Sequence, residues 1–262
     1  MKYAFMTFST PELELERVLA LASELGYDAV EARVSSGHKH AIEPDASAKT
    51  RQDARRAIEK SGVPICCVAT SCQFADPATA QENMEQALRC IDLAADVGSS
   101  RIRVFGGQLP QGMSREEAME QVAGALGKLA DQARQRGVTV CMETHDDWCN
   151  PAHVAQVMKR VNAPTIAVNW DIMHPVRRGG ATMDGAFQTL KPWIRHCHFH
   201  DGTATEPYHL TRIGEGVIDH SRAVKLLQGM RYDGYLSGEW IDFGPYEDYL
   251  AGELATMKGY ER

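Results

Sequence analysis

Short apolar runs alternate with longer amphipathic segments along the whole chain. A run such as residues 138–142 (VTVCM) is rich in β-branched residues and follows a glycine, which is typical of a buried parallel strand. The segments between these runs repeat apolar residues at helical spacing, and several of them end at glycine, as at Gly26, Gly98 and Gly137. The pattern therefore predicts strands and helices that alternate from end to end.

The predicted strands are short and evenly distributed, over residues 3–8, 29–33, 64–69, 101–105, 138–142, 165–170, 193–199 and 235–240. The predicted helices lie between and after them, over residues 11–25, 46–60, 77–97, 114–136, from 151, and over 184–190, 221–230 and 246–259. Eight strand–helix units with short connections favour a closed barrel over a doubly wound sheet, because a barrel leaves no sheet edge. We therefore expect an α/β protein, a (β/α)8 TIM barrel formed as a single domain over residues 1–262.

Composition supports one large core and narrows the range of partners. The chain has 262 residues, of which 44% are hydrophobic, and its formal net charge is −7. That charge argues against a nucleic-acid partner or an anionic membrane, either of which favours a basic face. Neither a signal peptide nor a membrane-spanning run is recognisable, so we expect a cytoplasmic protein. Seven cysteines, an odd number, suit reduced core packing better than a disulfide framework.

Three acids and one histidine stand at or near the ends of four successive predicted strands. They are Glu143, Asp171, His198 and Glu239. The carboxyl ends of barrel strands meet on one face, so these side chains can converge on one divalent cation. Three carboxylates and an imidazole are mainly hard donors, and their charge is costly if it is buried without a cation. Separate acids, each held by a lysine or a helix N-terminus, are the alternative.

Five motifs in the second half of the chain give a resemblance to a known family. They are residues 142–145 (METH), 169–174 (NWDIMH), 196–201 (HCHFHD), 213–219 (IGEGVID) and 232–239 (YDGYLSGE). In this order they resemble the xylose isomerase-like TIM barrels, which include sugar isomerases and epimerases, inosose isomerases and dehydratases, and endonuclease IV. The resemblance covers essentially the whole chain.

The resemblance implies roles for the four strand-end residues. Glu143, Asp171, His198 and Glu239 match the ligands of one divalent metal, with manganese expected and magnesium, cobalt or zinc as alternatives. In the family's epimerases, the glutamates that match Glu143 and Glu239 also exchange protons on opposite faces of the substrate, so both are candidate catalytic residues. The metal would coordinate a carbonyl oxygen and a neighbouring hydroxyl of the substrate and stabilise an enediolate.

Two histidines are candidates for contact with the substrate. His174 matches a family histidine that binds a substrate oxygen beside the metal, although a core or supporting role also fits it. His145 lies two residues beyond Glu143 and so shares its inward face, where it could bind substrate, steady the metal site or belong to the loop.

Three further residues complete the predicted substrate site. Asp201 is expected to orient a ligand or bind a hydroxyl, with a loop turn as the alternative. Arg212 stands where some relatives present a substrate-binding arginine, and a solvated arginine fits the position equally well. Glu31, with Arg33 at the end of the second predicted strand, is expected to line the opposite wall of the pocket or to form a structural ion pair.

The leading hypothesis is a metal-dependent isomerase or epimerase of a small keto sugar or inosose, with a free sugar or cyclitol favoured over a phosphorylated one. The alternative is a dehydratase of the inosose or dehydroshikimate type. An endonuclease IV-like role would need extra metal-binding histidines, which residues 68–70 (VAT) and 105–107 (FGG) lack. A non-catalytic sugar-binding barrel is disfavoured by the retained ligand set. Since related barrels often form dimers or tetramers, a homo-oligomer is an option.

Overall fold

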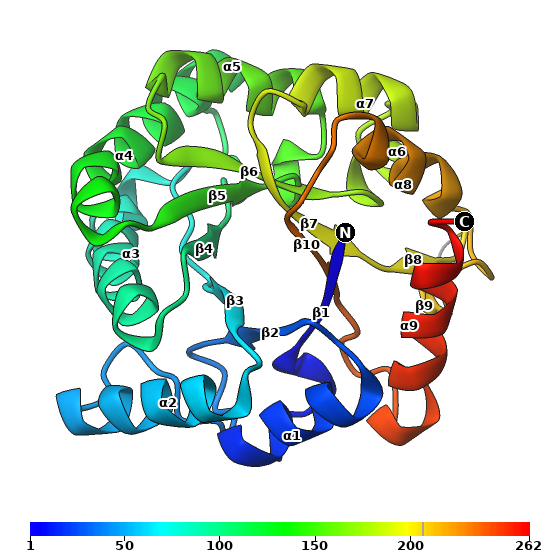
Figure 1. Ribbon diagram of the computed structural model, residues 1–262. Helices are drawn as coiled ribbons and strands as arrows, with labels where there is room; N and C mark the ends of the chain where they lie inside the picture. The colour runs from blue at the N-terminus through cyan, green and yellow to red at the C-terminus, as the bar shows by residue number, and fades with distance from the viewer. Residues whose placement is uncertain (206) are drawn as a thin grey trace.

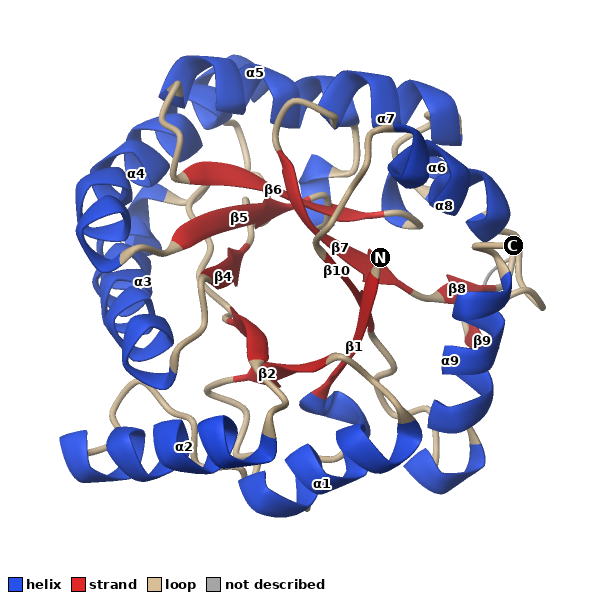
Figure 2. Cartoon of the chain, in the orientation of Figure 1, coloured by secondary structure: helices blue, strands red, loops and turns tan. Residues whose placement is uncertain are grey.

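Eight parallel strands close into a barrel in the computed structural model, which describes residues 1–205 and 207–262 (Figures 1 and 2). Around the barrel the order is β1-β10-β7-β6-β5-β4-β3-β2. The strands are β1 (Lys2–Met6), β2 (Ala29–Arg33), β3 (Ile65–Ala69), β4 (Arg101–Val104), β5 (Thr139–Glu143), β6 (Ile166–Asp171), β7 (Ile194–Phe199) and β10 (Tyr235–Gly238). The predicted TIM barrel is confirmed.

Helices form the outer ring of the barrel (Figure 1). They are α1 (Leu15–Leu25), α2 (Ala48–Ser61), α3 (Pro77–Val97), α4 (Arg115–Arg136), α5 (Pro151–Val161), α6 (His174–Arg177), α7 (Met183–Leu190), α8 (His220–Gly229) and α9 (Leu250–Gly259). Ser114 and Glu117 form the capping box at the start of α4. Gly137 ends α4 in the left-handed conformation with φ of 66°, which a side chain would disfavour. In the described part of the chain, no helix is long and apolar enough to span a membrane.

Several local details differ from the predicted elements. The first helix begins at Leu15, because residues 10–13 form a turn in which the Leu13 N–H donates to the Thr10 carbonyl. The last predicted helix is divided into a 3-10 turn, η3 (Tyr246–Asp248), and α9. The irregular stretch after β7 contains a short antiparallel pair, β8 (Asp201–Gly202) and β9 (Leu210–Thr211).

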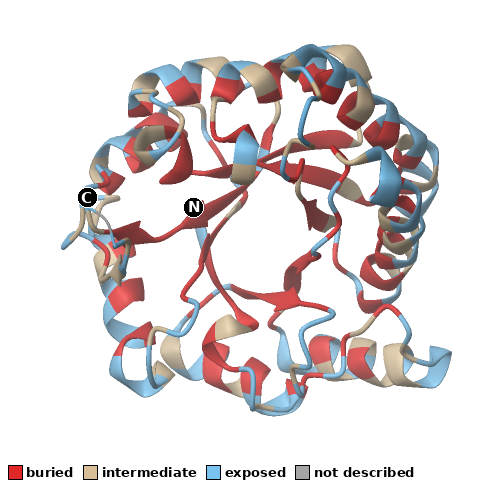
Figure 3. Ribbon diagram, turned by 180° about the vertical axis from the view of Figure 1, so that it is seen from behind, coloured by how far each residue is buried: buried red, intermediate tan, exposed pale blue. Residues whose placement is uncertain are grey.

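Burial is highest along the strands, while the helices expose their outer faces (Figure 3). Apolar strand residues such as Val30, Val68 and Val140 belong to the main core cluster, which also contains buried side chains of the surrounding helices. Residues of the opposite parity point into the barrel, and several of these are charged or polar. Seven buried cysteines remain free thiols. The fold therefore has an apolar layer between strands and helices and a polar interior at the carboxyl ends of the strands.

Candidate metal centre and active site

Glu143, Asp171, His198 and Glu239 lie together at the carboxyl ends of their strands. One potential ligand atom from each lies within 4.8 Å of those of the other three. Strand register produces this arrangement, since Asp171 pairs with His198 across β6 and β7, and Ser237 pairs with His198 across β7 and β10. All four are buried, and Glu239 is the most accessible at 7% exposure. The structure thus brings the four predicted residues to one point.

His198 has a different carboxylate on each side of its ring. Its Nδ1 lies 3.1 Å from Glu143 Oε1 and 3.4 Å from Glu239 Oε2. Its Nε2 lies 3.2 Å from Glu31 Oε1. When a carboxylate accepts a hydrogen bond from the N–H of one imidazole nitrogen, the other nitrogen is free to bind a metal. Nδ1 is therefore the nitrogen presented to the candidate metal site.

Asp171 is held by backbone and side-chain donors. The N–H groups of Met173 and His174 donate to its Oδ1 over 2.8 and 3.1 Å, at the start of the short helix α6. Its Oδ2 lies 2.6 Å from Nε2 of His200. Burial opposes ionisation, but His200 and His174 together hold the pKa of Asp171 well below its usual value. Asp171 is consequently an oriented, ionised carboxylate.

Two residues of this cluster were missed by the predicted site. His200 contacts Asp171 and also lines the pocket described below. The Nε atom of Arg103, on β4, lies 3.0 Å from Glu143 Oε2, and each of the two side chains is only 1% exposed. A sequence signal existed for each, because His200 shares the parity of His198 and Arg103 is a charge at an inward position of a strand. Neither signal showed that His200 contacts Asp171 or that Arg103 contacts Glu143.

The chemistry of the cluster fits a divalent cation. Three carboxylates share the site, and among the described residues Arg103 is the one arginine in ion-pair contact with them. Burying that much negative charge is costly unless it is offset. Glu143, Asp171, His198 and Glu239 supply oxygen and nitrogen donors of the kind that manganese, magnesium and zinc accept.

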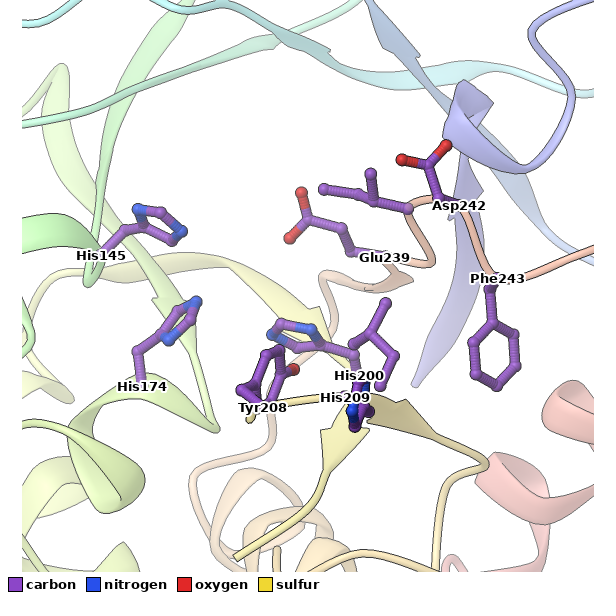
Figure 4. Close-up of a pocket in the computed structure, with 10 residues that line it drawn as sticks. His145, His174, His200, Tyr208, His209, Glu239, Asp242 and Phe243 are labelled. Atoms are coloured by element: carbon purple, nitrogen blue, oxygen red, sulfur yellow. The ribbon is translucent and has the colours of Figure 1, made fainter. Parts of the chain in front are cut away.

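A pocket of about 600 Å³ opens over the cluster (Figure 4). Its lining comes from several strand-end loops, namely His145, His174, His200, Tyr208, His209, Leu210, Glu239, Ile241, Asp242 and Phe243. Glu239 belongs both to this lining and to the candidate ligand set, so a molecule in the pocket can reach the cluster. The predicted residues His145 and His174 lie on the opposite side of the pocket from Asp242 and Phe243 in this view.

Two of the histidines that line the pocket, His145 and His174, differ in their protonation. Their rings meet edge to face, with centroids 4.4 Å apart. Burial lowers the pKa of His174 to about 4, so its imidazole is neutral at pH 7. Burial acts in the same direction on His145, but a 2.8 Å contact between its Nδ1 and Asp146 Oδ1 helps to raise its pKa to about 9. One wall of the pocket therefore offers a neutral and a cationic imidazole side by side.

Asp201 and Arg212, predicted to contact substrate, do not line this pocket. Asp201 is fully buried, and its carboxylate accepts hydrogen bonds from the backbone N–H groups of residues 202, 214, 216 and 218. It therefore fixes the loop before α8, as the loop-turn alternative anticipated. Arg212 has an exposed side chain, and its Nη2 donates to the Asp248 carbonyl over 2.8 Å. We do not retain either residue in the substrate site.

Glu31 also differs from its predicted position. It is fully buried inside the barrel, where its Oε2 lies 2.8 Å from His196 Nε2 and its Oε1 faces His198. It neither lines the pocket nor pairs with Arg33. Because two imidazoles approach it, Glu31 supports the cluster from within the barrel instead of touching a substrate.

Residues 19–260 match the xylose isomerase-like TIM barrel family, and the chain belongs to this family. A 3-dehydroshikimate dehydratase from Bacillus anthracis is 20% identical over 277 residues, which cover 98% of this chain and 96% of that protein. Fructoselysine 3-epimerase from Shigella flexneri is 22% identical over 270 residues, which cover 98% and 96%. The solved structure of the IOLI protein with a binding zinc atom has a TM-score of 0.80 at 19% identity and covers 99% and 97%. The relatives thus include both an epimerase and a dehydratase.

Proposed function

We propose that this protein is a divalent-metal-dependent isomerase or epimerase of a small keto sugar or inosose, with one ion held by Glu143, Asp171, His198 and Glu239. The observation that carries the proposal is the convergence of these four donors, within 4.8 Å of one another, beneath a pocket of about 600 Å³. A full-length relative named as a 3-epimerase supports the reaction class, and the zinc in the IOLI structure supports the metal. We place manganese first, with magnesium, cobalt and zinc as alternatives.

Each residue of the site has a role in such a reaction. A bound divalent ion would polarise the substrate carbonyl and acidify the adjacent C–H bond. Glu239 reaches the pocket, so its carboxylate can take up the carbon-bound proton, and Glu143 approaches the same point from another strand and can return a proton on the other face. Neutral His174 can hydrogen-bond a substrate oxygen, and cationic His145 can stabilise negative charge that develops on one.

Dehydration is the second candidate, and one contact favours it. Expulsion of a hydroxyl group as water requires a proton donor, and His145 is kept protonated by Asp146 at the edge of the pocket. The 3-dehydroshikimate dehydratase of Bacillus anthracis, similar over nearly its whole length, supports the same reaction class. Both candidates begin with removal of the C–H proton, and they differ in the next step, which is reprotonation of the carbon or loss of the neighbouring hydroxyl.

The decisive experiment combines metal analysis with isotope exchange. We expect about one divalent ion per purified chain and none in the Glu143→Ala/Asp171→Ala double variant. Keto sugars and inososes are then incubated with the manganese-loaded protein in deuterium oxide. Deuterium at the carbon beside the carbonyl indicates isomerisation or epimerisation, whereas a product lighter by one water indicates dehydration. Absence of metal from the parent protein, even after manganese is supplied, would overturn the proposal.

A further inference from the structure

Arg33 lies at the mouth of the barrel on the side opposite the four-donor cluster's strands. It is the last residue of β2, two positions after Glu31, so the two side chains share the inward face. Glu31 reaches His198 in the interior, and Arg33 follows it toward the carboxyl end of the barrel. Arg33 is 8% exposed, and the negative charge of Glu239 acts on its guanidinium. Arg33 therefore lies at the carboxyl end of the barrel, where the charge of one residue of the four-donor cluster reaches it.

The charge of Arg33 has no acidic partner among the residues that the structure describes. Its Nη1 donates to the carbonyls of Val34 and Ala69, and its Nη2 donates to Ser71 Oγ. Arg103, another inward arginine, is paired with Glu143 instead. Burial and the nearby Arg103 lower the pKa of Arg33 only to about 10, so it stays cationic at pH 7. Burying a cation whose hydrogen-bond acceptors are all neutral costs free energy unless a ligand supplies a negative charge.

The guanidinium N–H groups of Arg33 that these contacts do not use indicate which ligand group would pair with it. A guanidinium has five N–H donors, and the three contacts above leave Nε–H and one hydrogen on Nη2. Two donors on adjacent nitrogens match the two oxygens of a carboxylate. Ser71, which contacts Nη2, also lines a second, polar cavity of about 430 Å³ with Thr70 and Gln73, so the guanidinium edge beside Ser71 borders open space.

We propose that Arg33, supported by Ser71, binds a carboxylate group of the substrate, which makes the substrate a polyhydroxylated keto acid. This inference rests on the proposed function, because the metal cluster would hold the ketone while Arg33 holds the acid. A neutral ketose would leave the guanidinium without a counter-charge in direct contact. The site would then favour acidic over neutral substrates, because only a carboxylate pairs with the buried charge of Arg33.

Calorimetric binding to the manganese-loaded protein tests this assignment. The probes are D-tagaturonate and D-fructuronate, compared with D-tagatose and D-fructose and with the 6-phosphates of these two ketoses. We expect at least one keto acid to bind about tenfold or more tightly than its neutral counterpart, as a charge-assisted two-point contact allows. Arg33→Met should abolish this preference, so that acid and neutral sugar bind with similar affinity. Arg222→Met, at an exposed arginine paired with Asp184, should leave the preference intact.

Equal binding of acids and neutral sugars would overturn the assignment, as would a preference for phosphates or a preference that survives in Arg33→Met. If Arg33→Met does not fold, judged by circular dichroism, Arg33→Lys keeps the charge without the two-point edge, and Ser71→Ala removes the support. Both should reduce the acid preference severalfold, and an unchanged preference in both would refute the role. The proposed function fails separately, through absent manganese uptake or absent deuterium exchange, because the preference is measured by binding alone.

Discussion

Glu31 Oε1 lies 3.2 Å from Nε2 of His198, on the side of the imidazole away from Glu143. The same carboxylate lies 2.8 Å from His196 Nε2 through its other oxygen. Burial raises the pKa of Glu31, but the two histidines more than offset this and hold the pKa well below its usual value. An ionised Glu31 therefore fixes the orientation of His198 and directs Nδ1 toward the candidate metal position.

Replacing Glu31 with glutamine should weaken metal binding by about 10- to 100-fold, because the amide can accept from one imidazole only and presents N–H groups to the other. Calorimetric titration with manganese measures the effect. Glu253→Gln is the matched control, since Glu253 is also a buried carboxylate but lies on α9 and accepts from the Ile213 N–H. An unchanged manganese affinity in Glu31→Gln would show that His198 does not depend on Glu31.

Glu239→Gln should suppress deuterium exchange at the substrate carbon by at least about 100-fold, because the amide cannot serve as a base. The fold should persist, since the substitution is nearly isosteric, and the circular dichroism spectrum checks this. Asp242→Asn provides a control at another acid of the pocket lining that lies outside the four-donor cluster. Near-normal exchange in Glu239→Gln would remove Glu239 from the catalytic site.

His40 should make stability depend on pH. The Ile42 N–H donates to its Nδ1 over 3.0 Å, and its Nε2 lies 2.9 Å from the Arg33 carbonyl, so the buried ring is neutral. Burial lowers its pKa to about 4, whereas the unfolded chain binds the proton near pH 6.5. Protons therefore favour the unfolded state as the pH falls from 6.5 to 4, and this stability is fully present above 6.5.

The cost of lowering the pH from 7.5 to 4.5 should be about 2 to 3 kcal/mol smaller in His40→Gln than in the parent protein, because glutamine does not titrate. Urea unfolding at the two pH values measures this difference. Each protein serves as its own reference, so any penalty of the substitution that is independent of pH cancels. Equal losses in the two proteins would show that His40 does not contribute.

Asp201→Asn should destabilise the fold by about 3 kcal/mol, because the amide weakens the charge-assisted hydrogen bonds from the backbone N–H groups of residues 202, 214, 216 and 218. Thermal unfolding should show a lower midpoint, and the exposed Asp233→Asn should leave it unchanged. Manganese affinity should change little. A large rise in KM at full stability would instead restore the direct substrate contact that the sequence suggested.

Local patterns were enough to predict the barrel and its main cluster. The run at residues 138–142 predicted β5, and the Ser114–Glu117 capping box marked the start of α4, because both depend on near neighbours in the chain. The convergence of Asp171 and His198 followed from one geometric rule, since parallel strands end on the same face of a barrel. The helix α6 was not predicted, because a turn of His174–Arg177 is too short to show a period.

The sequence by itself determined the order of strands and helices, the inward parity of the charged positions and which residues stand at strand ends, because these depend on local periodicity. Only the tertiary structure decided which residues these side chains contact. Their places at or just after strand ends put Glu31, Arg33 and Asp201 near the site. These places could not show that Glu31 contacts His198, 167 positions away in the chain, or that Asp201 accepts hydrogen bonds from backbone amides. Such contacts depend on strand register and loop paths, which arise when the barrel closes and leave no local trace in the sequence.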